Sequence, residues 1–74
     1  MTTEANKAEK DRILGELDAM KCFEESAAEM YTEVAWDRRV TEPKIQNAFK
    51  KLAEDERRHT DLIREIIDLV DRAL

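Results

Sequence analysis

Apolar side chains recur at a spacing of three and four residues along most of this chain, which is the period of α-helices packed on one face. The pattern has one clear break, at Val40–Pro43, because proline favours the first turn of a new helix and the residue before it resists helical geometry. The sequence predicts a helix over about residues 3–39, a turn over about 40–43 and a helix over about 43–72. A connection this short makes the helices antiparallel neighbours, so the fold class is an all-α hairpin.

The second predicted helix carries the cleaner apolar stripe, and two polar residues interrupt it. Its positions are Ile45, Phe49, Leu52, Glu56, His59, Ile63, Ile66, Val70 and Ala73. Glu56 and His59 are adjacent on this stripe. The first helix has a matching stripe with one charged member, and its positions are Ile13, Leu17, Met20, Glu24, Ala27, Tyr31 and Val34. Helical periodicity therefore directs three polar side chains toward the packed face.

The register of the hairpin indicates whether these three side chains can meet. A buried carboxylate is costly unless a partner neutralises it. Counted from a turn centre near residue 41, Glu24 lies about 17 residues before it and Glu56 and His59 about 15 and 18 after it, so their heights agree within roughly 3 Å. Glu29 would lie roughly 4–9 Å nearer the turn and off the stripe. We therefore predict Glu24, Glu56 and His59 as metal ligands, with Glu29 as the alternative ligand from the first helix.

One hairpin supplies two carboxylates and one imidazole, which are too few for a closed two-metal site. Two hairpins related by a twofold axis would supply four carboxylates and two imidazoles in one four-helix bundle, the ligand set of di-iron carboxylate proteins. Two Fe²⁺ ions would balance the four negative charges. Oxygen-rich ligands with one histidine each suit iron or manganese, whereas zinc binds such sites without redox chemistry. The sequence predicts iron as the cofactor, two ions per subunit pair, with Mn or Zn as substitutes.

The composition argues against a nucleic-acid-binding protein and against a membrane-spanning one. We treat residues 1–74 as a single domain, whose one cysteine cannot form an internal disulfide, so metal or self-association must supply stability. The net charge is −5, with 18 acidic and 13 basic residues, and no basic stripe predicts a nucleic-acid partner. No apolar run approaches the roughly 20 residues that span a bilayer. The free thiol and the polar N-terminal segment favour a cytoplasmic location.

At its candidate ligands the chain resembles the ferritin-like superfamily, which includes rubrerythrins and ferritins. The run Glu24–Tyr31 is similar to the family's ligand glutamate followed by a tyrosine seven residues on, and the run Phe49–His59 is similar to its Glu-x-x-His helix. The resemblance implies a ferritin-like four-helix bundle with a di-iron site. It also implies a hydrogen bond from Tyr31 to a ligand carboxylate, whereas simple core packing is the other interpretation of this residue.

Within that superfamily the chain most resembles the short encapsulated ferritins, which are two-helix chains equivalent to half a bundle. Those proteins assemble their iron site across a subunit interface and form rings of dimers. The resemblance implies a homodimer at minimum, a ring of dimers as a larger assembly, and an encapsulin-type shell as a partner, which would add a protein nanocompartment to the expected locations. A gapless match through Trp36–Pro43 would place Glu29 at their first ligand position.

Two classes of function follow from these residues. The first is a ferroxidase-type enzyme, which oxidises Fe²⁺ with O₂ or peroxide in iron handling, storage and detoxification, with Glu24, Glu56, His59 and Tyr31 as catalytic residues. The second is an acidic helical hairpin that serves as an oligomerisation module, in which Glu56 and His59 fix the register of packing. A bundle that binds metal without catalysis is a third hypothesis.

Overall fold

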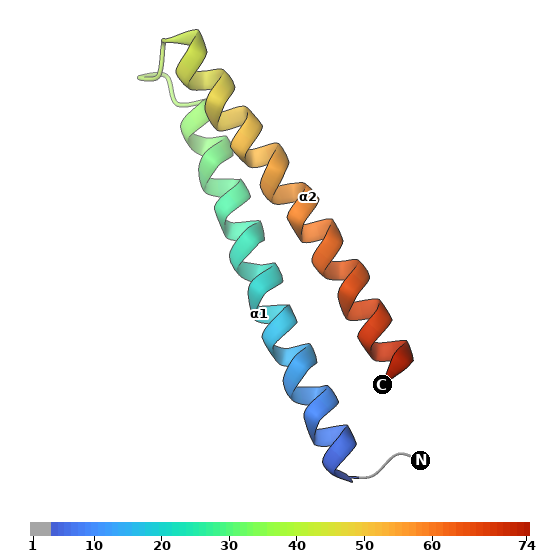
Figure 1. Cartoon of the computed structure of the whole chain (residues 1–74). Helices are drawn as coiled ribbons and strands as arrows, with labels where there is room; N and C mark the ends of the chain where they lie inside the picture. Colours follow the sequence, from blue (N-terminus) through green and yellow to red (C-terminus); the bar gives the residue numbers. More distant parts are fainter. Residues whose placement is uncertain (1–3) are drawn as a thin grey trace.

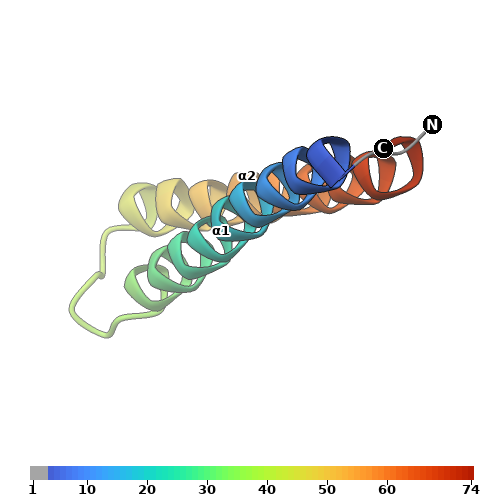
Figure 2. The same cartoon turned by 90° about the horizontal axis from the view of Figure 1, so that it is seen from below.

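The computed structural model describes residues 4–74 and consists there of two α-helices, α1 over Glu4–Ala35 and α2 over Pro43–Ala73. They run antiparallel and side by side along their length, so that α1 begins and α2 ends at the same end of a rod (Figure 1). Figure 2 shows the connection over residues 36–42 closing the other end. The rod measures 58 × 14 × 10 Å. The predicted all-α hairpin is confirmed, while the predicted helix start at residue 3 lies outside the described residues.

The first helix ends at Ala35, earlier than the predicted end near residue 39. The reason is local: the Asp37 carboxylate accepts hydrogen bonds from the backbone N–H of Arg39 at 2.8 Å and from its guanidinium at 2.7 and 3.0 Å. Aspartate side chains that bond the backbone two residues on stabilise turns in competition with helices. The periodicity of apolar residues extends past Ala35, but this polar turn ends the helix.

The start of α2 follows the predicted chemistry of a proline-initiated helix. Glu42 has extended backbone angles, φ −78° and ψ 118°, and its side chain accepts a hydrogen bond from the backbone N–H of Lys44 at 3.2 Å. Pro43 occupies the first turn, where a missing N–H costs nothing. The side-chain amide of Gln46 donates to the carbonyl of Val40 at 2.8 Å. This bond ties the first turn of α2 to the connection and fixes where the helix begins.

Small side chains hold the two helices together. The buried residues of the described chain are Ala28, Ala35, Ala53, Thr60 and Ile63. Many large apolar side chains stay more than two-fifths exposed, among them Met20, Phe23, Met30, Trp36, Ile45, Leu52, Leu62, Ile66 and Leu69. An isolated hairpin therefore leaves uncovered much of the surface that would stabilise it. Within residues 4–74, neither helix has a stretch apolar enough to cross a membrane.

The seam between the helices divides the surface into two flanks. Residues seven apart share a helix face, and large apolar side chains gather on one side of the seam. We call this side the apolar flank, defined by Met20, Phe23, Met30, Ile45, Leu52 and Ile66. The other side is the polar flank, defined by the interhelical contacts of Arg57 with Thr32 and of Arg64 with Glu25.

Candidate metal centre

The structure brings together three of the residues singled out from the sequence. Glu24 of α1 and Glu56 and His59 of α2 each offer one ligand atom, and these atoms lie within 4.8 Å of one another. His59 Nδ1 is 3.8 Å from Glu24 Oε2 and 3.9 Å from Glu56 Oε1. Glu56 and His59 share a face because they are one helical turn apart, and the register of the hairpin supplies Glu24.

The two carboxylates of the cluster are partly buried and have few basic neighbours. The side chains of Glu24 and Glu56 are only 25% and 18% exposed. Within residues 4–74, His59 is the only basic residue with a nitrogen within 4 Å of either carboxylate. Partial burial of two negative groups without a full counter-charge is unfavourable, and a bound cation would offset that cost.

The donor set fits iron on chemical grounds. Two carboxylates and one imidazole form an oxygen-rich set that suits iron or manganese better than copper. The separations of 3.8 and 3.9 Å exceed those of hydrogen bonds, so none of these side chains closes the space by bonding another. Ligand atoms that share one metal at bonds of about 2.1 Å lie roughly 3–4 Å apart. The cluster is therefore a candidate for holding a metal ion, with its three ligand atoms within 4.8 Å of one another.

The cluster opens onto the apolar flank. The side chain of His59 is 56% exposed, and Leu52 and Ile66 lie seven residues before and after it on the same face of α2. Both of these apolar neighbours are exposed in the hairpin. The uncovered side of the cluster is therefore surrounded by surface that favours contact with another apolar surface over contact with water.

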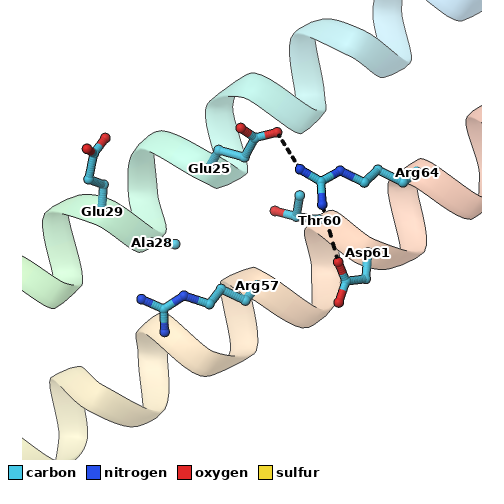
Figure 3. A pocket seen from close by; sticks show the side chains of 7 residues that line it. All are labelled: Glu25, Ala28, Glu29, Arg57, Thr60, Asp61 and Arg64. Atoms are coloured by element: carbon cyan, nitrogen blue, oxygen red, sulfur yellow. Dashed lines mark hydrogen bonds and ion pairs between the residues drawn. The ribbon is translucent and has the colours of Figure 1, made fainter.

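Glu29, the alternative ligand, lies elsewhere. It belongs to the lining of a hollow on the polar flank, together with Arg57 and Arg64 (Figure 3). The carboxylate cluster found in residues 4–74 contains Glu24 and does not contain Glu29. Of the two candidates from α1, the structure places Glu24 beside Glu56 and His59.

Tyr31 lies against an aromatic neighbour. Its ring centre is 6.1 Å from that of Phe49, with the rings tilted by 48°. Such a pair stabilises packing between the helices. No hydrogen bond of the Tyr31 hydroxyl is found among the described residues, so a single chain does not form the bond to a ligand carboxylate that the resemblance implies.

The sequence pattern did not reveal the hollow of the polar flank. Arg64 pairs with Glu25 at 3.5 Å and with Asp61 at 3.6 Å, while Arg57 donates to the hydroxyl of Thr32 at 2.8 Å (Figure 3 shows the two ion pairs). The signal that could have predicted it is a second seven-residue spacing on α2, with small residues at 53 and 60 beside arginines at 57 and 64.

Comparison with known protein families gives one match. The family model described as Rubrerythrin matches residues 17–74, which is more than half of the chain. The matched segment contains Glu24, Glu56 and His59. Neither the curated proteins nor the solved structures include a significant match.

Proposed function

The chain belongs to the rubrerythrin family of the ferritin-like superfamily, and from this premise we propose that it is a ferroxidase-type enzyme. The family indicates a di-iron carboxylate protein with oxidoreductase chemistry. In our proposal the enzyme oxidises Fe²⁺ with O₂ or peroxide at a site shared between two copies of the chain. The observation that supports it most is the cluster of Glu24, Glu56 and His59 at the edge of an exposed apolar surface.

The need for a second copy follows from the ligand count and from the exposed flank. One hairpin offers three ligand residues, whereas two hairpins about a twofold axis offer six. His59 lies near the middle of α2, so two hairpins that dock about an axis through the cluster overlap along their full length. That overlap would cover Phe23, Leu52 and Ile66 and complete a four-helix bundle.

Each residue has a defined task in this proposal. Glu24 and Glu56 would hold the iron ions by their carboxylates, and His59 would add a nitrogen ligand from each copy. Bound iron would supply the redox chemistry, in which two Fe²⁺ ions are oxidised to Fe³⁺ and the two electrons go to O₂ or peroxide. In the dimer, Leu52 and Ala27 would become covered beside the buried Ile63 and exclude water, which would strengthen the attraction between carboxylate and cation. The free Tyr31 hydroxyl can orient a ligand carboxylate once the second copy is present.

The decisive test combines crystallography with oxygen uptake. Crystals soaked in Fe²⁺ should show anomalous scattering from two ions between two chains, bounded by Glu24, Glu56 and His59 of each. Oxygen consumption on addition of Fe²⁺ distinguishes an enzyme from a bundle that only binds metal. Iron found on surface carboxylates of single hairpins would contradict the shared site, and iron bound without oxygen or peroxide consumption would contradict catalysis.

One observation favours a second candidate, an oligomerisation module without metal. His59 Nδ1 lies within 4 Å of both carboxylates, so a protonated imidazole could pair with Glu24 and Glu56 and fix the register of packing. Thermal unfolding separates the candidates, because an iron site raises the unfolding midpoint when Fe²⁺ is present and a register contact does not.

The encapsulin-type shell and the location inside a nanocompartment stay predictions.

A further inference from the structure

Two contacts cross the seam on the polar flank, whereas the candidate metal cluster opens onto the apolar flank. The guanidinium of Arg57 on α2 donates a hydrogen bond to the hydroxyl of Thr32 on α1 at 2.8 Å. Seven residues further along α2, Arg64 pairs with Glu25 at 3.5 Å (Figure 3). Thr32 and Glu25 are also seven residues apart. Because the spacing is the same on both helices, one register of the hairpin makes both contacts, and sliding one helix along the other breaks both.

The buried residues beside these contacts are small. Ala28 and Thr60 line the hollow that Arg57 and Arg64 also line (Figure 3). Two alanines are buried in the same way seven residues nearer the turn, Ala35 on α1 and Ala53 on α2. Small side chains form shallow ridges, so they allow helices to approach closely but oppose sliding and rotation only weakly. The register on this flank therefore depends on the polar contacts.

The contact between Arg57 and Thr32 has a defined geometry. Thr32 is half-buried, and its hydroxyl donates its own proton to the carbonyl of Ala28 at 2.8 Å. This bond orients the hydroxyl and leaves its oxygen as an acceptor for the guanidinium. The donors of arginine have a rigid planar arrangement, which makes the contact sensitive to direction. Arg64 and Glu25 are both exposed, and an exposed ion pair contributes little.

Arg57 also directly follows the candidate ligand Glu56 in the sequence. Consecutive residues of an α-helix point about 100° apart, so one residue can face the cluster while the next reaches across the opposite side of the seam. A rotation of α2 that removed Arg57 from Thr32 would turn Glu56 by the same angle relative to Glu24. His59 would turn with it, because it lies one helical turn further on the same face.

We propose that Arg57 and Thr32 are positioning residues, which hold the two helices at the rotation and height that bring the three candidate ligands together. The inference rests on the proposed function, because it concerns the iron site that those ligands would form. It also gives a reason why Glu24 and not Glu29 lies in the cluster. To bring Glu29 to the height of Glu24, α1 would have to slide by about 7.5 Å, and the contact of Arg57 with Thr32 would be lost.

The test compares Fe²⁺ binding in variants that remove this hydrogen bond and keep the ligands. Thr32→Val has nearly the shape of threonine but lacks the hydroxyl, and Arg57→Met keeps the apolar part of the side chain but lacks the donors. Each should raise the Fe²⁺ dissociation constant by roughly tenfold in anaerobic calorimetric titrations, the lower end of the range for contacts that orient metal ligands. Thr32→Ser keeps the hydroxyl and should bind as the wild type does.

Two further readouts separate positioning from a general loss of stability. The double variant Thr32→Val/Arg57→Met should bind no more weakly than the weaker single variant, because the two side chains act through one bond. The visible absorption of bound Co²⁺ reports the geometry of its ligands. At saturating Co²⁺ the spectrum of Thr32→Val should differ from that of the wild type, and the spectrum of Thr32→Ser should not. A role confined to stability would leave all of these saturated spectra alike.

The matched control is Lys10→Met, which removes another contact across the seam. Lys10 Nζ donates to the carbonyl of Asp71 at 2.8 Å, at the open end of the hairpin and far from the cluster. This variant should lower the unfolding midpoint of the metal-free protein, measured by circular dichroism, and leave the Fe²⁺ affinity unchanged. Arg57 is exposed, so Arg57→Met keeps the test decisive even if Thr32→Val does not fold.

The inference and the proposed function fail in different ways. Equal Fe²⁺ affinities in the wild type, Thr32→Val and Arg57→Met overturn the inference alone, as does an equal loss of affinity in Lys10→Met. A wild-type protein that does not bind Fe²⁺ overturns the proposed function, and the inference with it.

Discussion

The two flanks of the hairpin each carry an exposed aromatic residue in a very different setting. Phe23 on the apolar flank is 74% exposed and belongs to a surface of large aliphatic side chains beside two partly buried carboxylates. Trp36 on the polar flank is 68% exposed. The ammonium group of Lys50 lies over its ring, and the buried residues Ala35 and Ala53 line the same hollow.

The two flanks also differ in whether their charged side chains have partners of opposite charge, and this difference separates ordinary surface charges from a candidate binding site. On the polar flank, Arg64 is matched by Glu25 and Asp61 within one chain, and such exposed pairs contribute little to stability. At the edge of the apolar flank, Glu24 and Glu56 have only His59. Partly buried carboxylates on an exposed apolar surface indicate that a cation binds there and that another protein surface covers the site.

The largest effect should come from removing a ligand of α2. Glu56→Gln and His59→Ala should each reduce the rate of Fe²⁺ oxidation by more than about a hundredfold, since loss of a ligand exceeds the 10- to 100-fold cost of losing a supporting contact. Oxygen consumption measures the rate. Glu65→Gln is the matched control, because Glu65 is exposed on the same helix, and it should keep the full rate. Activity retained in Glu56→Gln would remove Glu56 from the site.

A paired substitution on α1 decides between the two candidate ligands. Glu24→Gln should cost more than about a hundredfold in iron oxidation, whereas Glu29→Gln should leave the rate unchanged. The two substitutions make the same chemical change, one within the cluster and one on the polar flank. The reverse result would show that the assembled protein uses the register of the gapless family match and that the hairpin register does not persist in the dimer.

Iron should stabilise the protein strongly. At a free Fe²⁺ concentration about 100 times the dissociation constant, binding contributes about 2.7 kcal/mol. For a domain of this size that corresponds to a rise of roughly 10–20 °C in the unfolding midpoint. Circular dichroism under anaerobic conditions, with Fe²⁺ or with a chelator, measures the shift. An equal midpoint in both would support the oligomerisation module instead.

The two exposed aromatics provide a direct comparison of the flanks. Phe23→Ser should weaken the metal dimer by at least about tenfold, because the ring becomes covered on association, and burial of a phenylalanine contributes about 1.5–3 kcal/mol. Trp36→Ser should leave that dimer unchanged. Sedimentation in the presence of Fe²⁺ measures both. Equal effects of the two substitutions would contradict the assignment of the dimer surface to one flank.

The smallest effect belongs to the turn, outside both flanks. The hydrogen bond from the Arg39 side chain, with the backbone N–H of the same residue, lowers the pKa of Asp37 from 3.8 to about 2. Because the folded pKa is below the unfolded one, the stabilisation is complete above the unfolded value and is lost as the pH falls through about 2. Asp37→Asn should therefore lower the unfolding midpoint slightly at neutral pH. A difference from wild type that grows on acidification would contradict this account.

The features that depend on helical periodicity could be predicted from the sequence. The stripe of α2 with its two polar members, the antiparallel hairpin and the similar heights of Glu24, Glu56 and His59 along it all follow from a rise of 1.5 Å per residue and a single proline break. The end of α1 was predicted at about residue 39 and lies at Ala35, because the side chain of Asp37 bonds the backbone of Arg39. Apolar spacing contains no information about such a bond.

The amino-acid sequence by itself determined two helices, their direction and the height of three candidate ligands, because these are set by local geometry and by the position of one proline. Only the tertiary structure showed which of Glu24 and Glu29 lies beside His59. It also showed that the buried seam is made mostly of small residues, with Ile63, while most other large apolar side chains remain exposed. These outcomes depend on how each helix rotates about its axis when two faces pack, and that rotation is a property of the pair of helices.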